Sequence, residues 1–94
     1  MTKNLLHGTY DLHVHTSPDV TPRKCGDTEL GERLTAAGMA GCAIKCHFNY
    51  TSARAVLLQQ RFPSLRVAGG VTLNRAVGGL NPHAVPYLVK KVKE

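Results

Sequence analysis

A short apolar strand followed by a helix signal occurs three times along the chain, and this repeat limits the folds open to it. The expected strands cover Gly8 to His15, Gly41 to Cys46 and Leu65 to Leu73. Strands that alternate with helices form a parallel sheet, because each helix returns the chain to the same end. The sequence therefore predicts an α/β fold of the order β-α-β-α-β-α with right-handed crossovers.

The first expected helix follows a loop from Ser17 to Gly26. Asp27 is a good N-cap for a helix from Thr28 to Ala37. Its apolar residues recur at helical spacing, and Gly38 is placed to end it. This segment is the clearest helix prediction in the chain.

Two further helices are predicted from capping residues and prolines. One is expected to start near Thr51 or Ser52, and Pro63 lies just beyond its end. In the other, Asn81 is a suitable cap and Pro82 occupies the first helical position. These two helices complete the second and third strand–helix units.

Three such units have the spacing found in a (β/α)₈ barrel, a fold that needs about 250 residues. The 94 residues form one α/β domain, 1–94. Two arrangements stay open. The domain is a partial TIM-like barrel corresponding to its first three units, or it is a three-stranded sheet whose unpaired edges need a partner, such as a second copy of the chain.

Composition and charge restrict the partners. The chain is 43% hydrophobic, has no signal-peptide or membrane-spanning run and carries a net charge of +6, so a cytoplasmic globular protein with small anionic ligands is expected. Nucleic acid is a weaker expectation, because the aromatic residues Phe48, Tyr50 and Phe62 are too scattered for base stacking. The three cysteines are expected to be free thiols. A zinc site at Cys42, Cys46 and His47 is disfavoured, because four strand residues span about 13 Å.

The segment DLHVHT places Asp11, His13 and His15 at alternate positions of the first strand. Alternate strand residues share one face, so two imidazoles and a carboxylate are expected together. Lys45 and His47 end the second strand in the same way. Imidazoles suit zinc, iron and manganese, so a divalent metal site is predicted at the carboxyl ends of the strands, where parallel α/β folds bind ligands.

Three segments resemble a known group of proteins. DLHVHT with Asp19, the run AIKCHFNYTSA from Ala43 and the run LNRAVGGLNPHAV from Leu73 are similar to the PHP superfamily and to amidohydrolase-like metal hydrolases. The resemblance implies that His13 and His15 hold the metal, and that His47 is a third ligand or supports a ligand at the same centre. It also implies that Asp19 orients a ligand or the attacking water, with Asp19 or His47 transferring a proton.

Two positions depart from the PHP pattern. Cys46 stands where an aspartate usually precedes the histidine of the second strand, and Thr72 stands where a glutamate usually ends the third. A site with one metal ion is therefore expected rather than a cluster of two or three.

Basic and amide side chains near the strand ends are candidates for binding the substrate. Arg23, Arg75 and Asn74 are expected to hold a phosphate or carboxylate. For Lys45 three roles stay open: anion binding, a carboxylated bridge between metals, or exposure to solvent.

Three functions compete on this evidence. The first is a metal-dependent hydrolase that acts on a phosphoester or amide-type substrate through a metal-activated water. The second is a non-catalytic metal-binding or assembly module derived from a truncated barrel. The third is a small basic protein that binds nucleic acid.

Overall fold

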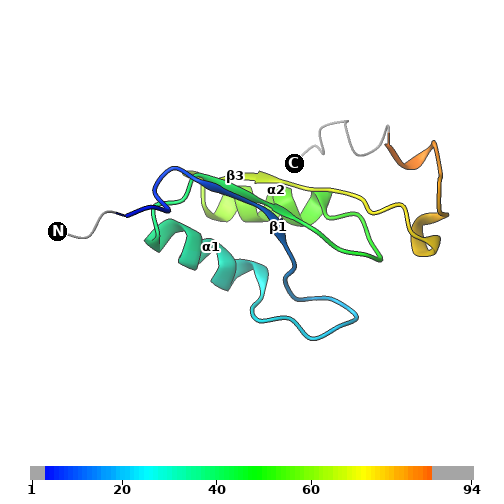
Figure 1. Cartoon of the computed structure of the whole chain (residues 1–94), viewed down its shortest axis with the longest axis horizontal. Coiled ribbons are helices and arrows are strands. Elements are labelled where there is room, and N and C mark those ends of the chain that lie inside the picture. The colour runs from blue at the N-terminus through cyan, green and yellow to red at the C-terminus, as the bar shows by residue number, and fades with distance from the viewer. Residues whose placement is uncertain (1–3, 86–94) are drawn as a thin grey trace.

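The computed structural model describes residues 4–85, and it has the predicted alternation of strands and helices (Figure 1). The elements are β1 (Tyr10–Val14), α1 (Asp27–Ala36), β2 (Gly41–Ile44), α2 (Ser52–Arg61), β3 (Arg66–Ala68) and a short 3₁₀ helix, η1 (Arg75–Val77). The strands form one parallel sheet in the order β1-β2-β3. The α/β fold class with a parallel sheet is thus confirmed.

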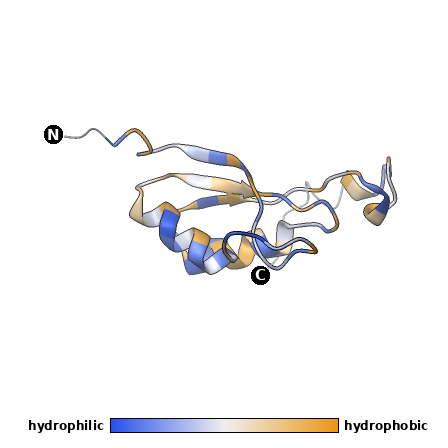
Figure 2. Ribbon diagram, turned by 60° about the horizontal axis from the view of Figure 1, so that its bottom comes forward, coloured by the Kyte–Doolittle hydropathy of each residue, from blue (hydrophilic) through white to orange (hydrophobic). Residues whose placement is uncertain are grey.

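Both long helices pack on the same face of the sheet (Figure 2). The core between them joins side chains from every layer, and its buried members are Leu30, Leu34, Cys42, Ile44, Leu58 and Leu65. Cys42 and Ile44 alternate along β2, so this strand directs both side chains toward the helices. Burying such side chains is the main favourable contribution to folding, at roughly 1.5–3 kcal/mol for a large aliphatic group.

The third strand is shorter than predicted because the backbone after it has other partners. β3 ends at Ala68, although the apolar run continues to Leu73. The carbonyl of Gly70 accepts a hydrogen bond from the amide of Thr51, and the amide of Gly70 donates to the Thr51 hydroxyl. These bonds turn the chain toward the start of α2 and away from the sheet.

The ends of the helices agree with the prediction in position but not in capping chemistry. Thr51 is the N-cap residue of α2, yet its hydroxyl donates to the carbonyl of Ile44 rather than capping the helix. The prediction of Asp27 as an N-cap is wrong, because Gly26 caps α1 and Asp27 is its first residue. Gly38 follows α1 with a φ of 72°, the left-handed conformation expected of a terminating glycine.

The third predicted helix falls largely outside the described residues. Within them, Asn81 and Pro82 precede a turn, and Ala84 and Val85 are helical. The 3₁₀ helix η1 was not predicted. In the described part of the chain, no helix is long and apolar enough to cross a membrane.

A bulge in β1 breaks the alternation that the sequence suggests. Tyr10 and Asp11 pair with Gly41 and Cys42, but the next pair joins Val14 to Ile44, so β1 contains one extra residue. The carboxylate of Asp11 accepts a hydrogen bond from the amide of His13 across this bulge, at 3.1 Å.

The bulge changes which residues share a face. Asp11 is in register with Cys42, whose side chain is only 1% exposed in the core. Paired residues of a sheet point to the same side, so Asp11 belongs with the helix-facing residues. The expectation that the side chain of Asp11 shares a strand face with His13 and His15 is therefore wrong.

Candidate functional site

Three histidine side chains meet at the carboxyl ends of β1 and β2, His13 from within β1 and His15 and His47 from the segments that follow the strands. The ring centroids of His13 and His15 are 5.3 Å apart, and those of His15 and His47 are 5.1 Å apart. The rings of His15 and His47 are stacked, with an angle of 16° between their planes. The structure therefore brings together all three histidines that the sequence analysis selects as metal ligands.

His15 is the least satisfied member of this histidine cluster (His13, His15 and His47). Its Nδ1 atom is buried and has no hydrogen-bond partner within residues 4–85. Burial lowers the pKa of His15 most strongly, and the positive charge of Arg23 adds to this effect. Asp19 acts in the opposite direction, but the net shift is downward. His15 is therefore a neutral imidazole at physiological pH, with a nitrogen able to accept a ligand.

The lowered pKa of His15 predicts a pH dependence of stability. A histidine whose pKa is lower in the folded state binds fewer protons there, so acid favours unfolding. In the metal-free protein, the free energy of unfolding is expected to fall as the pH drops below about 6.5, the unfolded-state value. Urea unfolding at pH 7.5 and 5.5 measures this loss, which should be smaller in His15→Gln. An equal loss in both proteins would contradict it.

Asp19 lies near the cluster, and both of its carboxylate oxygens accept hydrogen bonds. Its side chain is 0% exposed and accepts a hydrogen bond from Arg23 Nε at 2.8 Å. It also accepts from the backbone amide of Val20 at 2.7 Å, while Cys46 Sγ lies 3.7 Å from its Oδ1. The hydrogen bond from Arg23 is the largest cause of the lowered pKa of Asp19, which overcomes the opposing effect of burial. Asp19 is therefore a carboxylate.

Asn74 connects the segment after β3 to the cluster. Its Nδ2 donates to the carbonyl of His47 at 3.1 Å and lies 3.4 Å from His47 Nδ1. Because metal-binding histidines are commonly fixed through their second ring nitrogen, Asn74 is placed to orient His47. The role of Asn74 as a substrate-binding residue stays a prediction.

The other predicted substrate-binding side chains differ in exposure. Lys45 directly follows β2 and lines a cavity of about 390 Å³ with Cys46 and the segment 70–73. Arg75 is exposed at the start of η1, whereas Arg23 is partly buried against Asp19. Of these three basic residues, only Arg23 makes an ion pair within the described residues.

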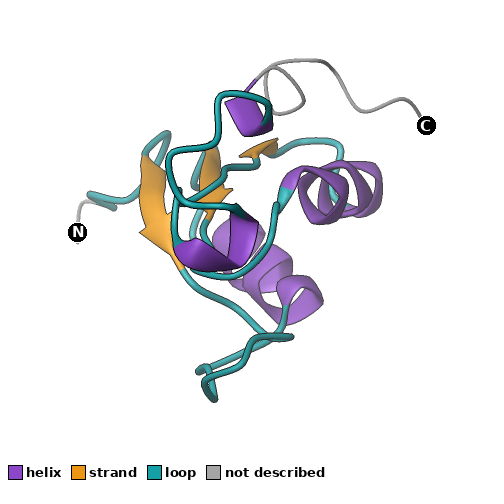
Figure 3. Ribbon diagram, turned by 90° about the vertical axis from the view of Figure 1, so that its right-hand side faces the viewer, coloured by secondary structure: helices purple, strands orange, loops and turns teal. Residues whose placement is uncertain are grey.

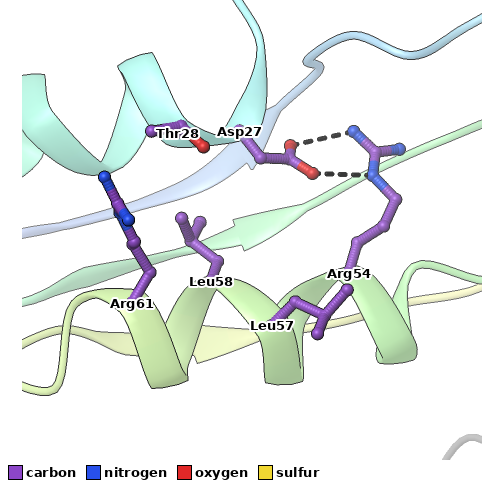
Figure 4. Close-up of a pocket in the computed structure, with 6 residues that line it drawn as sticks. All are labelled: Asp27, Thr28, Arg54, Leu57, Leu58 and Arg61. Atoms are coloured by element: carbon purple, nitrogen blue, oxygen red, sulfur yellow. Dashed lines mark hydrogen bonds and ion pairs between the residues drawn. The ribbon is translucent and has the colours of Figure 1, made fainter.

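Arg54 is a functional candidate that the sequence analysis missed. Its guanidinium forms two bonds to the carboxylate of Asp27, each 2.9 Å long (Figure 4). It also donates to the hydroxyl of Thr16 at 2.8 Å and to the carbonyls of Thr16 and Ser17. Arg54 thereby ties α2 to α1 and to the residue that follows His15. No local spacing reveals this contact, because its partners are 27 and 38 positions away.

Among the described residues, the cysteines form no metal-ligand set. Cys25, Cys42 and Cys46 are free. Burial raises the pKa of Cys42 to about 11, so this thiol stays protonated. Cys46 is 3% exposed and faces Asp19.

The cluster has the nitrogen donors of a metal site, but its side chains are not arranged around one ion. Two imidazoles on one tetrahedral zinc ion have centroids roughly 5–6 Å apart, given Zn–N distances of about 2.0–2.1 Å. The observed separations agree with this spacing, and the unpartnered Nδ1 of His15 supplies a free donor. However, no three His, Cys, Asp or Glu side chains among residues 4–85 are already arranged to hold an ion. The residues fit a metal only after the side chains rotate.

Comparisons with known proteins assign a family. A model of a family of unknown function, DUF6282, matches residues 8–92, which span all the strands and both long helices. A search of curated proteins and a search of solved structures each found no significant match. The chain therefore belongs to the DUF6282 family.

Proposed function

We propose that the chain provides the metal centre of a metal-dependent hydrolase related to the PHP and amidohydrolase-like enzymes. The observation that carries this proposal is the histidine cluster, in which three imidazoles from two strand ends surround a buried, unpartnered nitrogen of His15. Such an orphaned polar atom calls for a ligand, because an unmet buried nitrogen is unfavourable. Zinc, manganese or iron suits this donor set.

The chain's own residues would divide the work of hydrolysis. His13, His15 and His47 would hold the ion, which when bound supplies a water of lowered pKa and polarises the bond to be cleaved. Asp19 lies where it can accept a proton once it is freed from Arg23, and His47 is a second proton carrier. Asn74 would keep the His47 ring in place.

The space next to the cluster suits a small substrate. A cavity of about 590 Å³ lies between the loops that follow β1 and β2 and shares Asp19 with the site. Its wall combines apolar and polar side chains: Pro18, Val20, Asn49, Tyr50 and Arg54. With Arg54 in this wall and Arg23 paired to Asp19, we propose a small anionic substrate that carries a phosphoester or an amide-type bond.

Metal content is the first test of this function. Protein purified without chelator should contain close to one equivalent of zinc, manganese or iron by elemental analysis. The His13→Ala/His15→Ala variant is expected to lose this metal, because removing two of three neutral ligands lowers affinity by several orders of magnitude. His7→Ala/His83→Ala removes the two histidines outside the cluster and should retain the metal.

Two results would contradict the proposal. Equal metal content in both histidine variants would show that the cluster is not the site. Stoichiometric metal at the cluster, without turnover of any phosphoester or amide in a broad screen, would favour a non-catalytic metal-binding module.

A further inference from the structure

The ion pair between Asp19 and Arg23 faces the histidine cluster. Asp19 is four residues beyond His15, and its carboxylate also contacts Cys46, the neighbour of His47. The Asp19 side chain is completely buried, whereas 22% of the Arg23 side chain is exposed. Among the charged groups of the described residues, these two act on His15 with opposite signs. Asp19 is therefore a carboxylate near the imidazoles that is already paired with an internal cation.

A guanidinium and a divalent ion make the same demand on a carboxylate. Both need its oxygen lone pairs, and both are stabilised by its negative charge. Arg23 Nε contacts Oδ2, while the other oxygen, Oδ1, accepts from the Val20 amide and faces Cys46. Because the Asp19 side chain is 0% exposed, a metal ion at the cluster reaches its oxygens only after one of the groups that cover them moves away. Arg23 is the partner that can leave, since its side chain borders solvent.

We propose that Arg23 is an internal competitor of the metal ion, which binds Asp19 in the metal-free protein and is displaced when the ion takes this carboxylate. This regulation presupposes the metal centre proposed above. Displacement turns a neutralised arginine into a free guanidinium at the rim of the site, where it can pair with the anionic group of a substrate.

The exchange makes metal binding and anion binding support each other. An anion that holds the displaced guanidinium removes the competitor of the metal, so it tightens metal binding. By linkage, the metal tightens anion binding by the same factor. Substrate recognition by Arg23 is therefore expected only in the metal-loaded protein.

Zinc titration of four proteins tests the competition directly. The wild type, Arg23→Gln, Asp19→Asn and the double variant form a mutant cycle, and isothermal titration measures the dissociation constant of zinc for each. Arg23→Gln is expected to bind zinc about tenfold more tightly, because a charge-assisted hydrogen bond no longer has to be broken. In the Asp19→Asn background, Arg23→Gln should have almost no effect.

An NMR measurement on the wild type provides a second readout. The Nε–H resonance of Arg23 should exchange slowly with water in the metal-free protein, because it donates to a buried carboxylate. Addition of zinc should abolish this protection.

Arg66→Gln, which changes an exposed arginine on β3, is the matched control for the zinc titration and should leave the zinc affinity unchanged.

The outcomes separate failure of this inference from failure of the metal centre. Zinc binding that is equal or weaker in Arg23→Gln overturns the competition but leaves the metal centre intact. Tightening that persists in the Asp19→Asn background identifies simple charge repulsion and also overturns it. Zinc binding by none of the proteins removes the metal centre, and the competition with it.

Discussion

Replacing Gly41 with alanine is expected to unfold most of the protein at room temperature. A Cβ atom at this position would lie 1.8 Å from the carbonyl oxygen of Arg66 and 2.7 Å from its carbonyl carbon. These are backbone atoms of the paired strand, so no side-chain rotation relieves the clash. β2 and β3 would have to separate where their pairing begins. We expect a loss of at least about 3 kcal/mol, a large fraction of the stability of a small domain.

Urea unfolding followed by circular dichroism measures this effect, with Gly70→Ala as the matched control. A Cβ at Gly70 would meet the carbonyl of Ile44 at 3.8 Å, an ordinary contact. Its substitution is expected to change the free energy of unfolding by less than about 1 kcal/mol. Similar stabilities of the two variants would show that β2 and β3 do not approach each other as described.

Replacing Arg54 with alanine is expected to lower the free energy of unfolding by about 2–4 kcal/mol. The guanidinium donates to Asp27, Thr16 and Ser17, and four-fifths of its side chain is buried. Without it, the partly buried carboxylate of Asp27 loses its counter-ion. The hydroxyl of Thr16 still bonds to Asp27, but the link between the two helices is gone.

Arg61→Ala is the matched control for this second prediction. Arg61 lies on α2 as Arg54 does, and both side chains line a groove of about 430 Å³ (Figure 4). Arg61 makes no ion pair among the described residues. Its removal should cost less than about 0.5 kcal/mol. Chemical denaturation of both variants, with the zinc affinity measured in parallel, gives the comparison. Equal stabilities of Arg54→Ala and wild type would contradict the bridging role.

The sequence predicted the parts of the fold that depend on local chemistry. The helices begin and end within a residue or two of positions marked by Asp27, Gly38, Thr51 and Pro63. The alternating apolar residues of the second strand correctly indicate the core, because Cys42 and Ile44 are both buried. Such signals need only neighbouring residues, so they can be interpreted without the rest of the structure.

Features set by distant contacts were not predictable. The bulge in β1 depends on the register with β2, and it separates Asp11 from the histidines. The bonds between Thr51 and Gly70 shorten β3. At the candidate site, the proximity of His13, His15 and His47 was expected from the strand ends, whereas the pairing of Asp19 with Arg23 was not. Arg23 was predicted to bind a substrate, and its ion pair with Asp19 gave no signal in the local sequence.

The order of the strands also bears on how the protein reaches its folded state. Each strand pairs with the strand that precedes or follows it in the sequence, so the sheet can form in the order of the chain (Figure 3). Each parallel pairing nevertheless spans a whole helix, so closing it is slow compared with forming local contacts. All three imidazoles come from β1, β2 and the residues that directly follow them. The histidine cluster can therefore form once the first β-α-β unit has folded, before the chain beyond α2 packs against it.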